Sequence, residues 1–578
     1  MGWGPLPWPC SRLGAGKLHD TSHHSSQTAV LLSVPLKQAL ALVILSCLLW
    51  LPGFTALPVV DRDEARYAQA TKQMVQTGDY IDIRFQDEAR HKKPVGIYWL
   101  QSVSVKLTGV SDEIWAYRLP SLLAAMAAVL MTARMAAGLF GPPVFLPVGV
   151  LLAGCFLLGV GARVATTDAA LLVSVLAAQW MLGKAYLKSF SPSALVNTAQ
   201  AAIFWIAIAV GALIKGPVIL AIMGLTVLAL CVLSRSWRWL LHLRPIWGVP
   251  LFLAVLLPWF VAITLKSDGG FWVESFQKDI LSKAVSVQES HGAPPGSYVV
   301  SLLLTFWPWT ALLIPAAFTA FQQRKNPAVQ LCLAWLVPAW LMFELAPTKL
   351  PHYVLPLFPP LVALVALTLR DWAQLPAWLR RGTVVLWVVL VAAVGAGMAV
   401  APQAVGGAWS PWVMGATGLL VVVLCVALLR HSARPQTAMT QTAMNHAVLW
   451  AGGALVAFQA AFWQFTLPGL EQPWLSRTAA QLIAPYRTQC PGPVLSAGFQ
   501  EPSLVFTLGT DTRLGAGRIP QLSVTSCHLL LVDAHAWASV TAQLNGRVMV
   551  TLASADGYNY STNEKAQLTL YRLEPAQP

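Results

Sequence analysis

Charged residues are scarce in this chain, and acidic residues are scarcer than basic ones. Aspartate and glutamate number 24 in 578 residues, lysine and arginine number 38, and charged residues make up 11% of the chain. Hydrophobic residues make up 56%, and the mean hydropathy is +0.60. A soluble globular domain carries about 25% charged residues. The composition therefore excludes that class.

Several signatures of other protein classes are also missing. Met1–Lys37 lacks the charged start, short apolar core and cleavage site of a signal peptide, and we interpret it as a disordered cytoplasmic tail. Gly14–Lys17 resembles a phosphate-binding loop, but Ser11 and Leu18 stand where that motif needs Gly and Ser or Thr. The net charge of +14 comes without a soluble basic domain or an aromatic-basic stripe, so we expect no nucleic-acid partner.

Long apolar runs are abundant instead. A helix of about 20 apolar residues crosses a bilayer, and by this criterion we predict a polytopic α-helical membrane protein with about 13 transmembrane helices. The lipid bilayer is thus its first expected partner. The runs are Ala39–Leu57, Leu119–Leu139, Val144–Val160, Ala169–Leu187, Ala201–Ile214, Val218–Leu233, Ile246–Leu265, Tyr298–Phe318, Ala328–Leu345, Val354–Leu369, Val384–Val400, Trp412–Leu429 and Ala447–Phe465.

Lysine and arginine fall in alternate loops, and the positive-inside rule places these loops in the cytoplasm. They contain Lys184, Lys188, Arg235, Arg238, Arg244, Arg324, Lys325, Arg370, Arg380, Arg381, Arg430 and Arg434. The opposite face then receives 59–118, Arg163–Asp168, Lys215, Asp268–Gly296, Lys349–His352 and everything after Leu467. An odd number of crossings predicts a C-terminus outside the cytoplasm.

The composition changes near Pro468, so we divide the chain into a tail (1–37), a transmembrane domain (38–467) and a soluble α/β domain (468–578). In the last part, short β-prone runs alternate with turn residues. The predicted strands are Val494–Ala497, Ser503–Leu508, Cys527–Val532, Val548–Leu552 and Gln567–Leu573, and Trp474–Tyr486 is predicted to be helical. We interpret this domain as a lid or a support for the membrane part.

Two of the eight cysteines, Cys490 and Cys527, lie in this outer domain. The sequence allows two alternatives for this pair, a disulfide or two free thiols, because an oxidising compartment permits either. The other six lie in predicted spans or in the tail and are expected to be apolar packing residues.

Acidic residues gather at the outer face. Asp61 and Asp63 form an Asp-x-Asp pair in the loop 59–118, and Asp168 begins a span at the same membrane depth. Such carboxylates can position an acceptor, take its proton or hold a divalent cation. The alternative is that Asp63 and Asp168 cap helices. Two carboxylates, Asp63 and Asp168, at one membrane depth favour a shared site. No cofactor is required, and Asp61 with Asp63 would be the ligands if a metal binds.

Cations at the same face are less expected, because positive charge is disfavoured there. They are Arg66, Lys92, Lys93, Lys215 and Lys349. Each alone is explained as a solvated or snorkelling side chain. Together they predict a site for a phosphate-bearing ligand.

Several short motifs, in order and on one membrane side, resemble the aminoarabinose transferases of lipid A, which are protein-mannosyltransferase-like enzymes of GT-C fold. The motifs are Asp61–Tyr67, Gly78–Tyr80, Lys93-Pro94 with Tyr98-Trp99, Arg118–Pro120, Lys215–Pro217 and Lys349–Pro356. The resemblance covers roughly the first two-thirds of the chain. It implies a glycosyltransferase of the bacterial inner membrane with a periplasmic active site and C-terminus. Such enzymes modify lipopolysaccharide and are associated with polymyxin resistance.

The resemblance also implies substrates. The donor would be a sugar linked to undecaprenyl phosphate, with 4-amino-4-deoxy-L-arabinose as the best candidate, and the acceptor would be lipid A or another periplasmic molecule. A physical argument agrees, because nucleotide sugars are absent outside the inner membrane and a transferase there needs a lipid-carried donor.

Roles follow position by position. Asp63 and Asp168 match essential acids, Arg66 and Lys93 match contacts to the donor phosphate, and Tyr353 matches an aromatic residue near it. The remaining residues of the predicted substrate-binding set are Lys92, Tyr98, Lys215, Lys349 and His352.

One departure stands out. The family has Glu-Lys-Pro where this chain has Lys92-Lys93-Pro94. The change removes a carboxylate that could pair with a sugar ammonium group. The sequence is therefore also compatible with a different sugar or a different acceptor.

We expect a single displacement at the anomeric carbon with inversion. Lys93, Arg66 and Lys349 would stabilise the departing phosphate, while Asp63 orients or deprotonates the acceptor and Asp168 fixes the geometry. Alternatives are a protein or glycan O-glycosyltransferase of the same fold, a flippase for an anionic lipid, and a scaffold without catalysis. A flippase predicts repeat symmetry and charge at the membrane midplane, and we find neither in the sequence.

Overall fold

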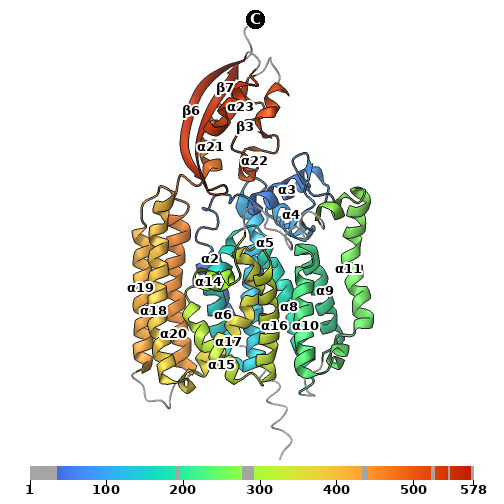
Figure 1. Cartoon of the computed structure of the whole chain (residues 1–578), viewed down its shortest axis with the longest axis vertical. Coiled ribbons are helices and arrows are strands. Elements are labelled where there is room, and N and C mark those ends of the chain that lie inside the picture. Colours follow the sequence, from blue (N-terminus) through green and yellow to red (C-terminus); the bar gives the residue numbers. More distant parts are fainter. Residues whose placement is uncertain are drawn as a thin grey trace, which may run out of the picture.

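The computed structural model describes residues 36–190, 196–275, 292–432, 441–521, 527–544 and 547–574. Most of the predicted tail and Arg434 lie outside these residues, as does the side chain of Arg430. The first described helix begins at Leu36, and the predicted domain boundaries stay predictions. Figure 1 shows a broad layer of near-parallel helices below and a smaller part with a sheet above.

Apolar runs form the helices of the lower layer. These are α2 (Leu36–Trp50), α5 (Ile114–Phe140), α6 (Phe145–Gly154), α7 (Phe156–Arg163), α8 (Asp168–Leu187), α9 (Thr198–Lys215), α10 (Val218–Ser234), α11 (Pro245–Lys266), α14 (Ser297–Thr305), α15 (Leu313–Gln322), α16 (Pro327–Leu345), α17 (Phe358–Arg370), α18 (Ala377–Val400), α19 (Pro411–Ser432) and α20 (Gln441–Ala460). Each predicted run coincides with one of these helices or with a broken pair of them.

Length and hydropathy identify the membrane-crossing helices more strictly. Among the described residues, seven helices are long and apolar enough to cross a bilayer, and α6 with α7, bent by 65°, make an eighth. Four more apolar helices are shorter, at 10–17 residues. The protein is therefore a multi-pass helical membrane protein, while the number of 13 crossings stays a prediction.

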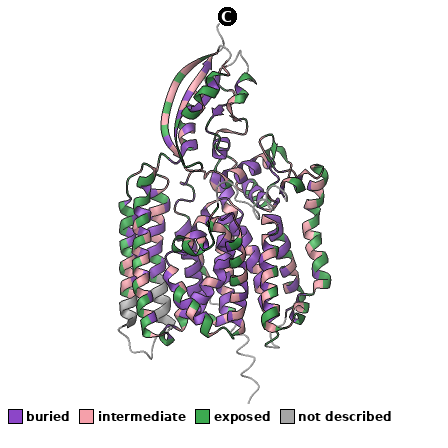
Figure 2. Ribbon diagram, in the orientation of Figure 1, coloured by how far each residue is buried: buried purple, intermediate pink, exposed green. Residues whose placement is uncertain are grey.

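Polar contacts lie at both ends of the helices. At one end, Arg370 at the end of α17 donates to the carbonyl of Phe140 at the end of α5, at 2.6 Å. At the other end, Lys215 at the end of α9 contacts Asp168 at the start of α8. Figure 2 shows exposed residues along the outer helices and buried residues between them, as lipid-facing helices require.

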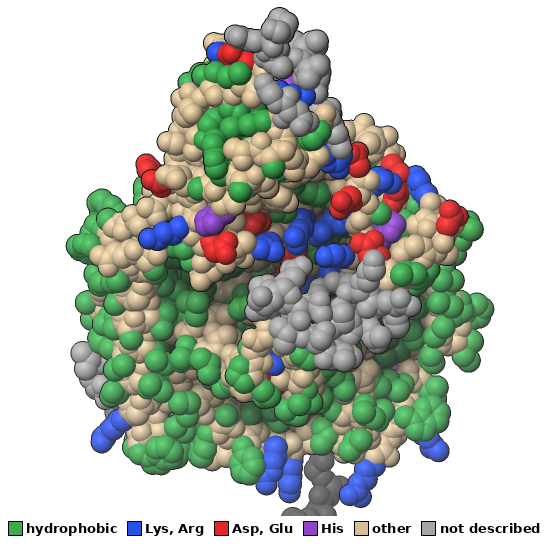
Figure 3. Space-filling view, turned by 45° about the horizontal axis from the view of Figure 1, so that its top comes forward, with side chains coloured by type: hydrophobic (Ala, Val, Ile, Leu, Met, Phe, Trp, Pro, Cys, Tyr) green, Lys and Arg blue, Asp and Glu red, His purple; other side chains and the backbone are tan. Residues whose placement is uncertain are grey.

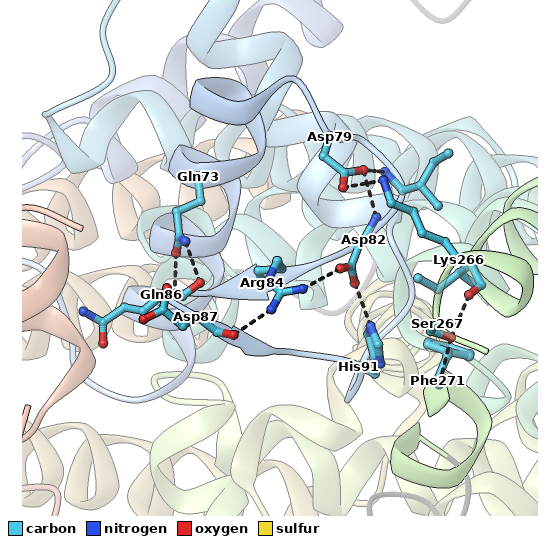
Figure 4. A network of polar contacts seen from close by, with 12 residues as sticks. Gln73, Asp79, Asp82, Arg84, Gln86, Asp87, His91, Lys266, Ser267 and Phe271 are labelled. Atoms are coloured by element: carbon cyan, nitrogen blue, oxygen red, sulfur yellow. Dashed lines mark hydrogen bonds and ion pairs between the residues drawn. The ribbon is translucent and has the colours of Figure 1, made fainter. Parts of the chain in front are cut away.

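The loop 59–118 covers the upper end of the helices. It contains α3 (Asp63–Thr77), the short strands β1 (Arg84–Phe85) and β2 (Glu88–Ala89), and α4 (Gly96–Thr108). Figure 4 shows the polar contacts that hold the β1–β2 turn: Asp79 with Lys266, Asp82 with His91 and Arg84, and Gln73 with Gln86. Lys266 ends α11, so this network ties the loop to a membrane helix.

The upper part contains a five-stranded sheet in the order β4-β3-β5-β7-β6. β3 pairs in parallel with β4 and β5, and β7 pairs antiparallel with β5 and β6. Its elements are α21 (Leu475–Ile483), β3 (Leu495–Ala497), α22 (Pro502–Leu508), β4 (Arg513–Leu514), β5 (His528–Asp533), α23 (Trp537–Thr541), β6 (Val548–Asn559) and β7 (Glu564–Glu574). Four of the five predicted strands and the predicted helix are confirmed, and Cys490 and Cys527 form a disulfide.

The predicted strand Ser503–Leu508 is wrong, because these residues form α22. Pro502 stands at the first helical position, where its fixed φ and missing N–H are favourable. Leu504, Val505 and Phe506 are all buried. A short run that is buried on every side has no periodicity with which to distinguish a strand from a helix.

Candidate active site

A fully buried ion pair fixes the start of α3. Arg118 donates from Nε and Nη2 to the two oxygens of Glu64, each at 2.8 Å, and also to the carbonyls of Phe54, Leu57 and Pro58. Glu64 accepts further hydrogen bonds from the backbone of Val60 and Ala165. These contacts bring the end of α2, the start of α3, α5 and the segment before α8 together. They therefore determine where Asp63 and Asp168 lie.

The two predicted catalytic acids share neighbours. His352 lies within electrostatic range of both Asp63 and Asp168, and Tyr67 does too. Asp168 is buried, whereas Asp63 is exposed at the start of α3. Both acids therefore lie near the same histidine and tyrosine, and their catalytic role stays a prediction.

The helix-capping alternative is wrong for both acids. The residues before the two helices are Arg62 and Thr167, and neither makes a side-chain cap hydrogen bond. Asp63 and Asp168 are instead the first residues of α3 and α8, where a negative charge is still favoured by the helix dipole. Arg62 has a φ of 66°, which is a strained conformation for a residue with a Cβ.

Lys215 is the cation most directly joined to this cluster. Its Nζ lies 2.5 Å from Oδ1 of Asp168, and 5.2 Å from the centre of the Tyr353 ring. His352 packs edge-on against Tyr353, with ring centres 4.9 Å apart. Lys93 is a further cation within electrostatic range of His352. Lys215 and His352 therefore lie beside Asp168, Tyr353 packs against both of them, and Lys93 lies on the side of His352.

Tyr98 belongs to the same site and leads to a residue that sequence reasoning missed. The Tyr98 hydroxyl accepts a hydrogen bond from Nε of Arg90 at 3.2 Å, and the Tyr67 and Tyr98 rings are 5.6 Å apart. The Arg90 guanidinium lies 5.3 Å from the centre of the Tyr67 ring. Burial raises the pKa of Tyr67 and of Tyr98, so both phenols stay protonated near neutral pH.

The other predicted cations are less tightly placed. Arg66 lies half-buried on α3, one helical turn after Asp63, and Lys92 is exposed beside Lys93. Lys349 is buried, and its Nζ donates to the carbonyls of Ala293 and Ala346, each at 2.7 Å. This ammonium group thus fixes the chain before α14, and its phosphate-binding role stays a prediction.

Asp61 makes its hydrogen bonds with residues far along the chain. Its Oδ1 accepts from the backbone of Ser503 at 3.3 Å, and its own N–H donates to the Tyr560 hydroxyl at 2.7 Å. Burial raises the pKa of Asp61 to about 6. Asp61 therefore contacts the sheet-containing part of the chain rather than the acid cluster. In the described ranges, no three His, Cys, Asp or Glu residues form a metal-binding group, and a divalent metal remains untested.

The surface around this site is strongly polar. Figure 3 shows Lys, Arg, Asp, Glu and His side chains in a band between the sheet-containing part above and an apolar surface below. Charge of both signs at the edge of an apolar surface suits a ligand with a charged head and a lipid tail.

Comparisons with known proteins point to one group. A family model described as dolichyl-phosphate-mannose-protein mannosyltransferase matches residues 92–261. The chain is 29% identical over 332 residues to the undecaprenyl phosphate-alpha-4-amino-4-deoxy-L-arabinose arabinosyl transferase of Enterobacter sp. (strain 638). It is 30% identical over 338 residues to the enzyme of that name from Aeromonas salmonicida (strain A449). The alignments cover 56% and 57% of this chain, and 58% and 60% of the relatives' own length.

The fold comparison covers more of the molecule. The structure of ArnT from Cupriavidus metallidurans bound to undecaprenyl phosphate matches with a TM-score of 0.72 and 18% identity, covering 95% of this chain and 98% of that chain. The predicted GT-C fold and the resemblance to the aminoarabinose transferases are therefore both confirmed.

Proposed function

We propose that this chain, which has the fold and the motifs of the aminoarabinose transferases, is an integral membrane glycosyltransferase that uses a polyprenyl-phosphate sugar as its donor. The names of its relatives support undecaprenyl phosphate as the carrier and 4-amino-4-deoxy-L-arabinose as the first candidate sugar. The ArnT structure with the same fold is bound to undecaprenyl phosphate, which also supports this carrier. The acceptor that we propose is a phosphate of lipid A.

The observation that carries this proposal is the cluster around His352. Asp63, Asp168, Lys93 and Lys215 all lie within electrostatic range of His352, and Lys215 is paired with Asp168. Transfer from a polyprenyl phosphate releases an anionic leaving group at this depth, and fixed positive charges stabilise such a group without reorganisation.

The proposed reaction is a single displacement. An acceptor oxygen attacks the anomeric carbon from the face opposite the phosphate, the new C–O bond forms as the bond to the phosphate oxygen breaks, and the configuration inverts. Lys93 and Arg66 hold the departing phosphate. Asp63 orients the acceptor and takes its proton if the acceptor is a hydroxyl; an ionised phosphate needs no base. Asp168 holds Lys215 in the site through their 2.5 Å contact.

We also propose that the site and the C-terminus lie on the periplasmic side of the inner membrane. Arginines occupy the opposite end of the helices, where Arg370 contacts α5 and Arg244 contacts Thr198 at the start of α9. The disulfide between Cys490 and Cys527 lies at the end that carries the sheet. Disulfides persist in oxidising compartments such as the periplasm, which supports this orientation.

A second candidate is a protein O-glycosyltransferase of the same fold. The matching family model is that of a protein mannosyltransferase, and it matches residues 92–261, which include Lys93, Asp168 and Lys215. The two candidates share the donor chemistry and differ only in the acceptor.

The test is sugar transfer by the purified full-length protein, supplied with undecaprenyl-phosphate aminoarabinose and lipid A. We expect a lipid A product heavier by one pentosamine on mass spectrometry, and no product from a folded Asp63→Asn variant. Transfer to a peptide but not to lipid A would support the second candidate. Movement of the donor across vesicles without a new covalent product would indicate a flippase and would refute the proposal.

A further inference from the structure

Arg90 is a buried cation that the proposed reaction does not use. The residue is 8% exposed, and its one side-chain hydrogen bond to a described residue joins Nε to the Tyr98 hydroxyl. The guanidinium also lies over the Tyr67 ring. Among the described residues, no carboxylate is in ion-pair contact with Arg90, and its terminal N–H groups have no hydrogen-bond partner. A guanidinium has five N–H donors, so most of them are unused.

Two other buried arginines at this end of the helices show what a structural role requires. Arg118 is completely buried and donates to both oxygens of Glu64 and to three carbonyls. Arg163 is also completely buried; it donates to the carbonyls of Leu49, Pro52 and Gly159 and lies over the Trp463 ring. In both residues every guanidinium nitrogen has a hydrogen-bond acceptor. The terminal nitrogens of Arg90 have no hydrogen-bond partner in the described part of the chain, and they are not among its fully buried unpaired atoms, so they remain accessible to a ligand.

The position of Arg90 separates it from the other cations. Its electrostatic neighbours are Tyr98, Tyr67 and Asp63, whereas those of Asp168 include Lys215 and His352. The backbone N–H of Arg90 donates to Ile83 at 2.7 Å, which fixes the residue at the end of the β1–β2 turn. Figure 4 shows the polar contacts that hold this turn, so Arg90 is presented from a rigid support. A ligand on Arg90 would therefore lie on the Asp63 side of the site.

We propose, on the basis of the proposed function, that Arg90 binds an anionic oxygen group of a substrate beside Asp63, separate from the leaving phosphate. A planar guanidinium matches a phosphate or a carboxylate with two parallel hydrogen bonds. The Tyr98 hydroxyl, which accepts from Arg90, keeps its own proton for a further hydrogen bond to the same group.

Two sources provide this chemistry: a phosphate on the acceptor and a carboxylate on the transferred sugar. An ammonium group on the sugar cannot occupy the position, because Arg90 would repel it. Lys92 adds to this repulsion, since it stands where the family carries a glutamate. An aminoarabinose donor therefore requires the acceptor phosphate as the partner of Arg90, with the sugar amine directed elsewhere.

The experiment compares Arg90→Gln and Arg90→Lys with Arg84→Gln in the purified full-length protein. Arg84 is the matched control, because it is on the same turn, its side chain is 48% exposed, and its partner is Asp82. We expect Arg90→Gln to raise the KM for the anionic substrate roughly 10- to 100-fold, the cost of a lost charge-assisted pair, with a smaller change in kcat. Arg90→Lys should recover part of this loss. Arg84→Gln removes a contact within the same turn but no substrate contact, so it should change the KM far less than Arg90→Gln.

Two matched substrate pairs distinguish the sources of the anion. If the acceptor phosphate is the partner, its removal weakens acceptor use by the wild type and has no effect on Arg90→Gln. If a sugar carboxylate is the partner, the wild type prefers a uronic acid donor over a neutral sugar, and Arg90→Gln loses this preference.

The proposal is wrong if a folded Arg90→Gln protein, with the melting temperature of the wild type, keeps the KM of every substrate; the proposed function then stands. If the wild type transfers no sugar from any polyprenyl phosphate, the proposed function fails instead. In that case the role of Arg90 is tested without turnover. The measurement is the change in melting temperature that phosphorylated lipid A causes in the wild type and in Arg90→Gln. Equal shifts would exclude it.

Discussion

Two buried ion pairs lie at the same end of the helical layer, and they differ in how their charges are satisfied. The side chains of Glu64 and Arg118 are both completely buried. Each carboxylate oxygen and each guanidinium nitrogen of this pair takes part in a hydrogen bond. Lys215 and Asp168 keep 10% and 8% side-chain exposure and are joined by one hydrogen bond of 2.5 Å. The Lys215 ammonium group has two further N–H donors, and it lies over the ring of Tyr353.

This difference provides a criterion that distinguishes structural ion pairs from functional ion pairs at a charged site. A saturated pair cannot exchange its partners without loss of stability, so it acts as a fixed joint between segments. A pair with unused hydrogen-bonding capacity can accept a substrate group without unfolding anything. By this criterion Glu64–Arg118 positions the site, whereas Asp168–Lys215 belongs to it.

The largest effect that we expect comes from breaking the saturated pair. Glu64→Ala leaves the Arg118 guanidinium buried without its carboxylate, which costs about 3–5 kcal/mol. We expect a large fall in melting temperature, measured on the detergent-purified protein, together with loss of activity. The control is Glu113→Ala, which removes an exposed acid from the same loop. Equal melting temperatures for the two variants would show that the pair is not a structural joint.

The second effect concerns the unsaturated pair. Asp168→Asn should lower kcat by about 100-fold or more, because Lys215 loses the carboxylate that holds its positive charge in the site, with little change in melting temperature. Its control is Asp112→Asn, because Asp112 has an 81% exposed side chain and pairs with Lys72 at the same face. Strong destabilisation with normal kcat in the folded fraction would reverse our assignment and make Asp168 a structural residue.

A smaller effect is expected at Lys93. Lys93→Ala should raise the KM for the polyprenyl-phosphate donor roughly 10-fold, because one charge-assisted contact to the phosphate is lost, while the KM for the acceptor changes little. Steady-state kinetics with each substrate varied in turn provide the measurement. A larger change for the acceptor than for the donor would place the leaving phosphate elsewhere.

Much of this architecture is predictable from the sequence, because membrane helices are recognised by length and hydropathy alone. The runs from Leu119 to Leu139 and from Ala169 to Leu187 correspond to α5 and α8. The convergence of Asp63, Asp168, Lys93 and Lys215 was also predictable, since the positive-inside rule places all four at one membrane face and charge there requires a reason.

Residue-level assignments were harder, because sequence does not reveal which charges neutralise one another. Glu64 follows Asp63, and its carboxylate is equally suited to catalysis by residue type. In the structure, however, this carboxylate forms a buried ion pair with Arg118. The sequence did not distinguish Arg90 from its cationic neighbours Lys92 and Lys93. Its burial depends on the β1–β2 turn, which the sequence did not predict. Lys349 was predicted as a phosphate ligand, but two backbone carbonyls accept its hydrogen bonds. These outcomes depend on tertiary contacts between distant segments.

Asp61 provides the smallest and most selective prediction, because it contacts the sheet-containing part and titrates near neutral pH. Burial raises its pKa to about 6 from 3.8, so the folded protein holds this proton more tightly than the unfolded chain. The contribution of Asp61 to stability is therefore highest below pH 3.8 and falls as the pH rises to about 6. Asp61→Asn keeps the uncharged form and should be more stable than the wild type above this range, by about 1–3 kcal/mol.

Melting temperatures of the wild type and Asp61→Asn across this pH range measure the difference. The two curves should coincide at low pH and separate as the pH rises, whereas the exposed control Asp556→Asn should follow the wild type throughout. Parallel curves would mean that the Asp61 carboxylate is not the titrating group. Separation in the opposite direction would mean that the charged form is stabilised by Arg62, whose Nε lies 3.6 Å from Glu501 at the same junction. The contacts between the loop and the sheet would then resemble the saturated Glu64–Arg118 pair rather than the unsaturated Asp168–Lys215 pair.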